Sequence, residues 1–193
     1  MKSSKWIIAT GVVLSAGILL SGCGKSASST STYSYVYTQD PDTLNYLMAN
    51  RATTSDVVTN LVDGLLENDQ YGNLVPALAK SWTVSKDGLT YTYKLRKDAK
   101  WSNGDPVTAH DFVFAWRRLV DPATAAPYAS YLSYLQVENA QDIIDGKKKP
   151  AELGVEAKDD YTFVVHATNP VPYAVSLTTH QSLLPLPQKV VEK

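Results

Sequence analysis

The chain has 193 residues, of which 44% are hydrophobic and 19% charged, a balance that predicts a folded body and argues against long disorder. The formal net charge of −1 supplies no basic excess to meet a phosphate backbone, which argues against nucleic-acid binding. The single cysteine excludes both an intramolecular disulfide and zinc sites built from cysteine pairs.

The first segment is typical of an export signal. A short basic start precedes an apolar run over residues 6–20, which suits a signal peptide but is short for a transmembrane helix. The run ends in LSGC, which resembles the lipobox of bacterial lipoproteins, with Cys23 as the residue that takes the lipid. We therefore predict that residues 1–22 are removed, that Cys23 is acylated and that residues 24–32 form a flexible tether. A plain secretory signal with an unrelated cysteine is the alternative.

Beyond the tether the pattern predicts short strands and helices. Residues 33–38 predict a strand, and residues 55–66 carry apolar side chains at helical spacing. Residues 82–84 and 89–96 predict a hairpin with an Asp-Gly turn. Four residues of its second strand alternate with polar ones and predict one buried face: Leu89, Tyr91, Tyr93 and Leu95.

A longer helix is predicted from Thr108 to Val120. Thr108 and Asp111 have the spacing of a capping box, and the pair Asp121-Pro122 predicts the end of the helix. Four further elements are predicted downstream: a helix opened by Pro127, a helix over 140–145, a hairpin over 155–167 and a helix over 173–180.

No catalytic or metal-binding motif is present in the sequence. None of the three histidines, His110, His166 and His180, lies in a His-Glu-x-x-His pattern, and there is no Gly-x-Ser-x-Gly elbow. We therefore expect no enzyme, no metal and no cofactor. From these patterns alone, a surface binding protein, a structural lipoprotein and an unrecognised hydrolase all stay open.

Several ordered blocks resemble the solute-binding proteins of bacterial peptide importers of the ATP-binding-cassette (ABC) type. The blocks that carry this resemblance are DPDTLN at 40–45, LVDGL at 61–65, GNLVPALAKSW at 72–82 and the long stretch 87–113. Three more are similar to the oligopeptide-binding branch: 116–131, 146–148 and 170–173. Together they run from about residue 33 to the last residue.

The resemblance implies an α/β fold of the periplasmic-binding-protein type II-like class, in its larger three-domain form. In such proteins two lobes close over a peptide, which is held as an added β-strand. The expected partners are oligopeptides and a membrane permease with separate ATPase subunits. We expect a monomer, held by a lipid anchor on Cys23 at the extracellular or periplasmic face of a bacterial membrane.

The resemblance also predicts the domain organisation. Because family members are far longer, we expect a truncated chain. It would comprise the start of the first ligand-binding domain (33–62), a small mixed α+β second domain with antiparallel hairpins (63–187) and a return to the first domain (188–193).

Four consecutive residues are expected along the peptide backbone: Asn50, Arg51, Ala52 and Thr53. The oligopeptide branch often has EGVP at this place, so the sequence departs from the pattern. Asn50 replaces an acid, which would change the preference for charged side chains. Arg51 replaces a glycine, which puts a close approach of the two backbones in doubt.

Two aromatic residues are also expected to contact the peptide. Tyr128, in the stretch PYASY, matches a tyrosine that contacts the ligand, and His180 falls where the branch places a pocket histidine. Because residues 50–53 depart from the pattern, a receptor for a signalling peptide or another small ligand stays open. So does a surface lipoprotein that transports nothing.

Overall fold

The computed structural model describes Ser34, Val36, Tyr37 and residues 39–192. The predicted signal, the lipid site at Cys23 and the tether lie outside the described residues, as do residues 33, 35 and 38 of the predicted strand. The described residues of that segment, Ser34, Val36 and Tyr37, do not lie in a strand. The chain divides into two units, Met1–Val36 and Tyr37–Lys193, and every element described below belongs to the second. Among the described residues, no helix combines the length and the apolar character that crossing a membrane requires.

An antiparallel sheet of four strands forms the base of the fold. Its order is β3 (Ala79–Val84), β4 (Thr90–Leu95), β6 (Thr162–His166) and β5 (Val155–Asp159). Both predicted hairpins are confirmed, since β3 pairs with β4 and β5 pairs with β6. The central pair, β4 with β6, joins the two hairpins into one sheet.

One face of the sheet is buried. Tyr91, Tyr93 and Leu95 of β4 are between 1% and 4% exposed, as the alternating pattern predicts, and Leu89 is half-buried just before the strand. The opposite face is mostly polar, with Lys94 of β4 opposite Thr162 of β6, although Thr162 and Val164 of β6 are buried on it. A sheet that buries one face and leaves the other in water is typical of antiparallel architecture.

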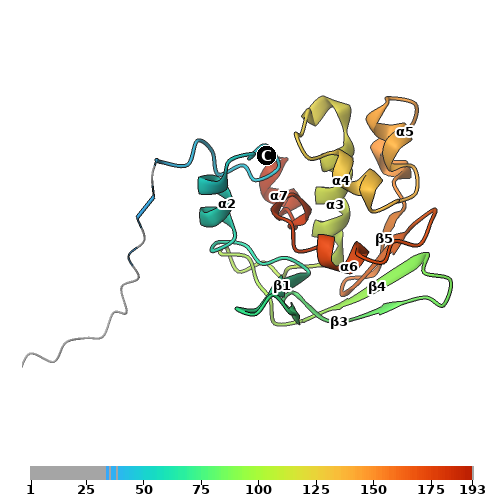
Figure 1. The fold of residues 1–193 in the computed structure, drawn as a ribbon, viewed down its shortest axis with the longest axis horizontal. Coiled ribbons are helices and arrows are strands. Elements are labelled where there is room, and N and C mark those ends of the chain that lie inside the picture. Colours follow the sequence, from blue (N-terminus) through green and yellow to red (C-terminus); the bar gives the residue numbers. More distant parts are fainter. Residues whose placement is uncertain (1–33, 35, 38, 193) are drawn as a thin grey trace, which may run out of the picture. The chain divides into compact units, whose positions relative to one another are not determined.

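Helix α3 (Ala109–Val120) packs on the buried face of the sheet (Figure 1). Its predicted start is confirmed, because the Asp111 carboxylate accepts hydrogen bonds from the Thr108 backbone N–H at 2.8 Å and from the Thr108 hydroxyl at 3.3 Å. The helix ends before Asp121, which is extended because Pro122 disfavours helical backbone in the residue before it.

Trp116 connects α3 to the rest of the core. Its ring meets that of Phe163 on β6 edge-on, with centroids 5.0 Å apart. Its indole Nε1–H donates to the carbonyl oxygen of Leu183 at 3.0 Å. Leu183 ends the short 3-10 helix η3 (Gln181–Leu183), so this bond fixes η3 against α3.

The helix predicted over 55–66 is displaced. Helix α2 runs from Ala52 to Val58 instead, and Leu65 and Leu66 are fully buried at the start of a separate hairpin. That hairpin pairs β1 (Leu66–Asn68) with β2 (Leu74–Pro76). The spacing of the apolar residues fits an amphipathic helix, but these leucines are apolar because they are buried in the core. The spacing alone does not distinguish the two cases.

Short helices complete the unit. They are η1 (Pro122–Thr124), α4 (Ser130–Tyr134), α5 (Ala140–Ile144), η2 (Pro150–Glu152), α6 (Ala174–Leu177) and α7 (Gln188–Val191). The predicted helices after Pro127 and over 173–180 are therefore present but shorter. In Figure 1, α4 and α5 lie on the same side of the sheet as α3.

Candidate functional site

A groove of about 330 Å³ lies between α2 and the segment that follows α6. It is lined by Ser55, Thr59, Tyr131, Ser176, Leu177, Thr179, His180 and Gln181. No residue in this lining carries a carboxylate, a guanidinium or an ammonium group. The lining comes from three segments that are far apart in the sequence, and it includes His180, one of the predicted contact residues.

Three aromatic rings gather beside the groove. The His180 imidazole lies between two tyrosines, with centroids 4.8 Å from the Tyr128 ring and 4.2 Å from the Tyr131 ring. The two tyrosine rings are 5.3 Å apart and nearly perpendicular. The structure therefore brings together Tyr128 and His180, which the resemblance predicted separately, and adds Tyr131.

The imidazole of His180 is held by the turn that follows it. Its Nδ1 accepts a hydrogen bond from the backbone N–H of Ser182 at 3.2 Å and lies 2.8 Å from the Ser182 hydroxyl. Burial lowers the pKa of His180, because water no longer solvates the charged form. The ring is therefore neutral near pH 7, with its proton on Nε2.

The segment 50–53 stands next to the groove and opens α2. Arg51 is the N-cap of α2 with extended backbone, so this position does not need a glycine. Its guanidinium Nε lies 3.0 Å from Asp42 Oδ2, in an exposed ion pair. The hydroxyl of Thr54 donates to Asp42 at 2.7 Å, and this bond, followed by the charge of Arg51, lowers the pKa of Asp42.

The other members of this segment are less constrained. Asn50 and Ala52 are exposed, while Thr53 is half-buried and its Oγ1 has no hydrogen-bond partner among the described residues. None of residues 50–53 lines the groove itself. A buried hydrogen bond of 3.1 Å from Gln181 Nε2 to the Ala49 carbonyl nevertheless ties this segment to the wall that carries His180.

Most of the residues that line the groove could not be predicted from the sequence. Ser55, Thr59, Ser176 and Thr179 belong to no motif, and hydroxyls on short helices are common on any surface. Tyr131 offered one signal, since it stands three residues after Tyr128 at the start of a predicted helix and shares its face.

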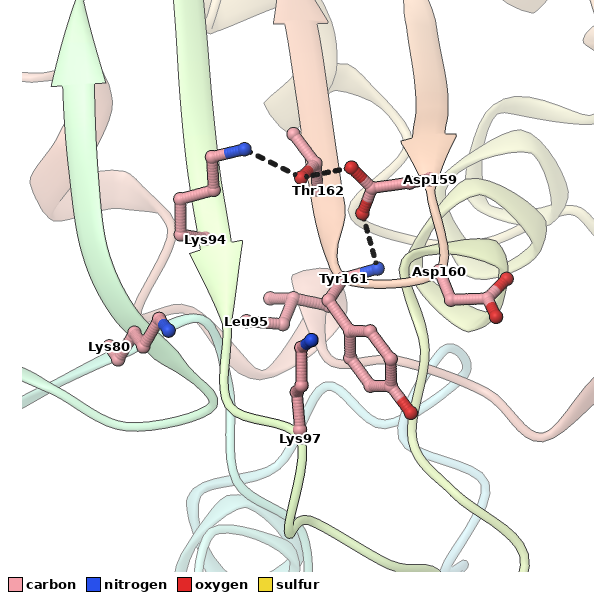
Figure 2. Close-up of a pocket in the computed structure, with 8 residues that line it drawn as sticks. All are labelled: Lys80, Lys94, Leu95, Lys97, Asp159, Asp160, Tyr161 and Thr162. Carbon is pink, nitrogen blue, oxygen red and sulfur yellow. Dashed lines mark hydrogen bonds between the residues drawn. The ribbon is translucent and has the colours of Figure 1, made fainter.

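A second pocket, of about 400 Å³, lies at one end of the sheet (Figure 2). Three lysines line it: Lys80, Lys94 and Lys97. Lys94 Nζ donates to the Thr162 hydroxyl at 2.8 Å, and that hydroxyl donates to Asp159 at 2.8 Å. These bonds secure the turn between β5 and β6, which gives the pocket a structural role.

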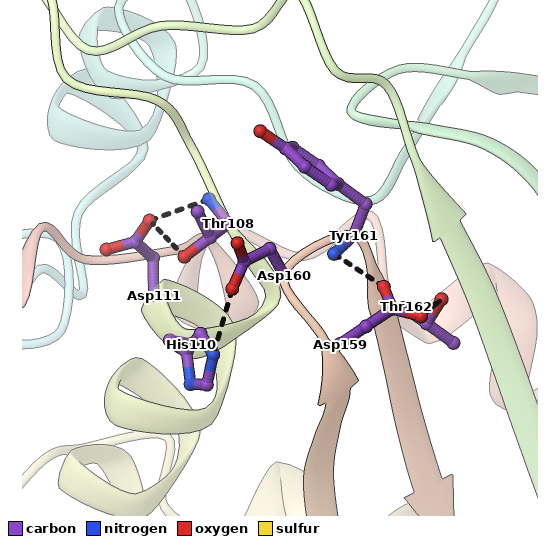
Figure 3. Close-up of polar contacts among 7 residues, drawn as sticks. All are labelled: Thr108, His110, Asp111, Asp159, Asp160, Tyr161 and Thr162. Atoms are coloured by element: carbon purple, nitrogen blue, oxygen red, sulfur yellow. Dashed lines mark hydrogen bonds and ion pairs between the residues drawn. The ribbon is translucent and has the colours of Figure 1, made fainter.

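The same turn is held to the start of α3. The Ala109 N–H donates to the Asp160 carbonyl at 2.8 Å, and His110 Nε2 lies 3.4 Å from the Asp160 carboxylate (Figure 3). Both side chains of that pair are mostly exposed. His166 is likewise paired, 3.5 Å from Glu156 across the outer face of the sheet. Among the described residues, neither His110 nor His166 forms a hydrogen bond or an ion pair with the groove lining.

Comparison with known proteins places the chain in a family. The model of bacterial extracellular solute-binding proteins, family 5 (middle), matches residues 73–193. The chain therefore belongs to this family, and the resemblance drawn from the sequence blocks is confirmed.

The relatives include oligopeptide-binding proteins. The chain is 78% identical over 139 residues to the periplasmic oligopeptide-binding protein OppA of Haemophilus influenzae, an alignment that covers 72% of this chain and 26% of the relative. It is 51% identical over 189 residues to the oligopeptide-binding protein AliB of Streptococcus pneumoniae, covering 95% of this chain and 28% of AliB.

Solved structures agree with these relatives. Haemophilus influenzae OppA in complex with RPPGFSPFR matches with a TM-score of 0.78 and 74% identity, over 79% of this chain and 30% of that one. Listeria monocytogenes OppA bound to peptide matches with a TM-score of 0.75 and 42% identity, again over 30% of its length. The predicted α/β periplasmic-binding-protein class is confirmed, and the chain spans less than a third of these relatives.

Proposed function

We propose that this chain belongs to the substrate-binding component of an ABC importer, which captures extracellular oligopeptides and delivers them to a permease. The observation that carries the proposal is the cluster of Tyr128, Tyr131 and His180 beside an open groove. It occurs in a chain that is 74% identical to a protein crystallised with a nine-residue peptide. No catalytic role is part of the proposal.

In this proposal, Asn50, Arg51, Ala52 and Thr53 lie along the peptide main chain. The exposure of Asn50, Arg51 and Ala52 at the start of α2 supports this role, and Thr53 beside them is half-buried. Tyr128 and His180 contact a peptide side chain in the groove. Aromatic rings with one polar atom suit this task, because they offer apolar area together with a hydrogen-bonding group.

The remaining features of the proposal concern the whole protein. Residues 1–22 direct export, and Cys23 carries acyl chains that hold the protein at the outer face of the cell membrane. The permease and separate ATPase subunits are its partners. The boundaries at residues 33, 63 and 188 separate parts of the two binding domains.

The test is a titration of the purified chain with RPPGFSPFR and with two unrelated short peptides, followed by NMR, which detects weak binding. We expect shifts of the groove residues with all three peptides. Tyr128→Ala should weaken binding about tenfold, the effect of losing one well-packed aromatic contact. Tyr71→Ala is the matched control, because Tyr71 is 79% exposed and belongs neither to the groove lining nor to the aromatic cluster.

The results of the three titrations distinguish the candidate functions. Binding of one peptide alone would favour a receptor for a specific signalling peptide. Absence of binding by all three peptides would contradict the proposal and favour a surface lipoprotein that takes no ligand.

A further inference from the structure

The hydroxyl groups of the groove have already donated their protons. On the α2 side, Ser55 Oγ donates to the Arg51 carbonyl at 3.1 Å and Thr59 Oγ1 donates to the Ser55 carbonyl at 2.9 Å. Serine and threonine in helices commonly form such bonds to the preceding turn. What these two side chains still offer to the groove is oxygen lone pairs.

The opposite wall repeats this arrangement. Ser176 Oγ donates to the Tyr173 carbonyl at 3.1 Å, and Thr179 Oγ1 donates to the Ser176 carbonyl at 2.9 Å. Thr179 also accepts a long bond of 3.4 Å from Asn68. Both walls therefore face the groove as hydrogen-bond acceptors.

Few donors balance these acceptors. One N–H of the Gln181 amide is used on the Ala49 carbonyl, and Nδ1 of His180 is occupied by Ser182. Among the described residues that line the groove, three donors retain a proton for a ligand: the second N–H of Gln181, the His180 Nε2–H and the Tyr131 hydroxyl. Neither wall carries a cation.

We propose that this groove selects a ligand side chain that donates hydrogen bonds, such as a carboxamide, and disfavours a carboxylate. The inference rests on the proposed function and specifies the ligand chemistry of the same groove. A carboxamide can place its N–H₂ against the hydroxyl oxygens and its carbonyl on His180 Nε2–H. A carboxylate has no proton to donate and would set its charge against four hydroxyl oxygens without a compensating cation.

The test compares two tripeptides of nearly identical shape, Ala-Gln-Ala and Ala-Glu-Ala, by NMR titration of the whole chain at pH 7. We expect Ala-Gln-Ala to bind about tenfold more tightly, the effect of roughly one hydrogen bond made in place of one unfavourable contact. Equal affinity, or tighter binding of Ala-Glu-Ala, would overturn this inference and leave the proposed function intact. Failure of both tripeptides to bind would overturn the inference together with the proposed function.

A double variant locates the preference. Ser55→Ala with Ser176→Ala removes one hydroxyl from each wall and keeps the shape of both helices. We expect the ratio of the two dissociation constants to fall to about threefold or less. Ser81→Ala with Thr83→Val, on the exposed outer face of β3, is the matched control and should leave the ratio unchanged. An unchanged ratio in the groove variant would also overturn the inference.

Discussion

At the scale of single residues, His180 combines three roles that its sequence position does not reveal. It caps η3 through Nδ1, it packs between Tyr128 and Tyr131, and it points a single N–H donor at the groove. The capping bond and the lowered pKa have the same consequence, because both favour the neutral ring. Near pH 7 the ring therefore offers its Nε2–H without carrying a positive charge.

This lowered pKa predicts a pH dependence of stability. The unfolded chain binds a proton on this histidine near pH 6.5, whereas the folded chain binds it only at lower pH. The unfolded state therefore holds more protons in this interval, and stability should fall as the pH drops below about 6.5 through the folded pKa.

The measurement is urea unfolding between pH 7.5 and 5, together with an NMR titration of the His180 ring. His180→Asn is the matched variant, because asparagine can still accept from the Ser182 N–H but does not titrate. We expect this variant to lose less stability on acidification than the parent chain. An imidazole that titrates at or above pH 6.5 would contradict the prediction.

At the scale of elements, both hairpins and α3 were predictable because their signals are local. Alternation in Tyr91 and Tyr93, and the spacing of Thr108 and Asp111, act within a few residues. The limits of α2 and the groove were not predictable in this way. Ser55 and Ser176 meet only because buried contacts such as Gln181 to Ala49 bring distant segments together, and no local pattern encodes that meeting.

The turn between β3 and β4 requires glycine for two reasons. Gly88 has a φ of +74°, and a Cβ there would lie 2.8 Å from Cβ of Pro170. Gly88→Ala should therefore lower the free energy of unfolding by about 2–3 kcal/mol, through backbone strain and the clash together. Gly72→Ala is the control, because its φ of +81° is similar but nothing lies within 4 Å of the added Cβ.

Denaturant unfolding of both glycine variants measures this difference. The control should lose only about 1 kcal/mol, from strain alone. Equal losses in the two variants would show that the Pro170 contact relaxes at no cost.

The junction between α3 and η3 depends on Trp116. Trp116→Phe would leave a void in the core, because Trp116 is fully buried. It would also remove the one side chain that, among the described residues, donates a hydrogen bond to the Leu183 carbonyl. We expect a loss of about 2–4 kcal/mol in the free energy of unfolding. Trp82→Phe is the comparison, since Trp82 is only half-buried and should cost clearly less. Similar losses would contradict the importance given to this bond.

At the scale of the whole molecule, the proposed lipid anchor on Cys23 would determine where the protein acts. Cys23→Ser should abolish acylation and release the protein from the membrane fraction, because a hydroxyl cannot form the thioether. The measurement is incorporation of labelled palmitate, with fractionation of the cells. Ser21→Ala, which keeps the thiol, is the control. Absence of the label from the parent chain would favour a plain secretory signal, and retention of the label in Cys23→Ser would contradict acylation at Cys23.

The hydrogen bond from Gln181 to Ala49 has a consequence for biosynthesis. It spans 132 residues of sequence, so the second wall of the groove leaves the ribosome long after the first. At about 5–20 residues per second, the delay is roughly 7–26 s. Throughout this interval α2 has no opposite wall and the nascent chain has no groove. The groove is therefore among the last features that the described part of the chain acquires during synthesis.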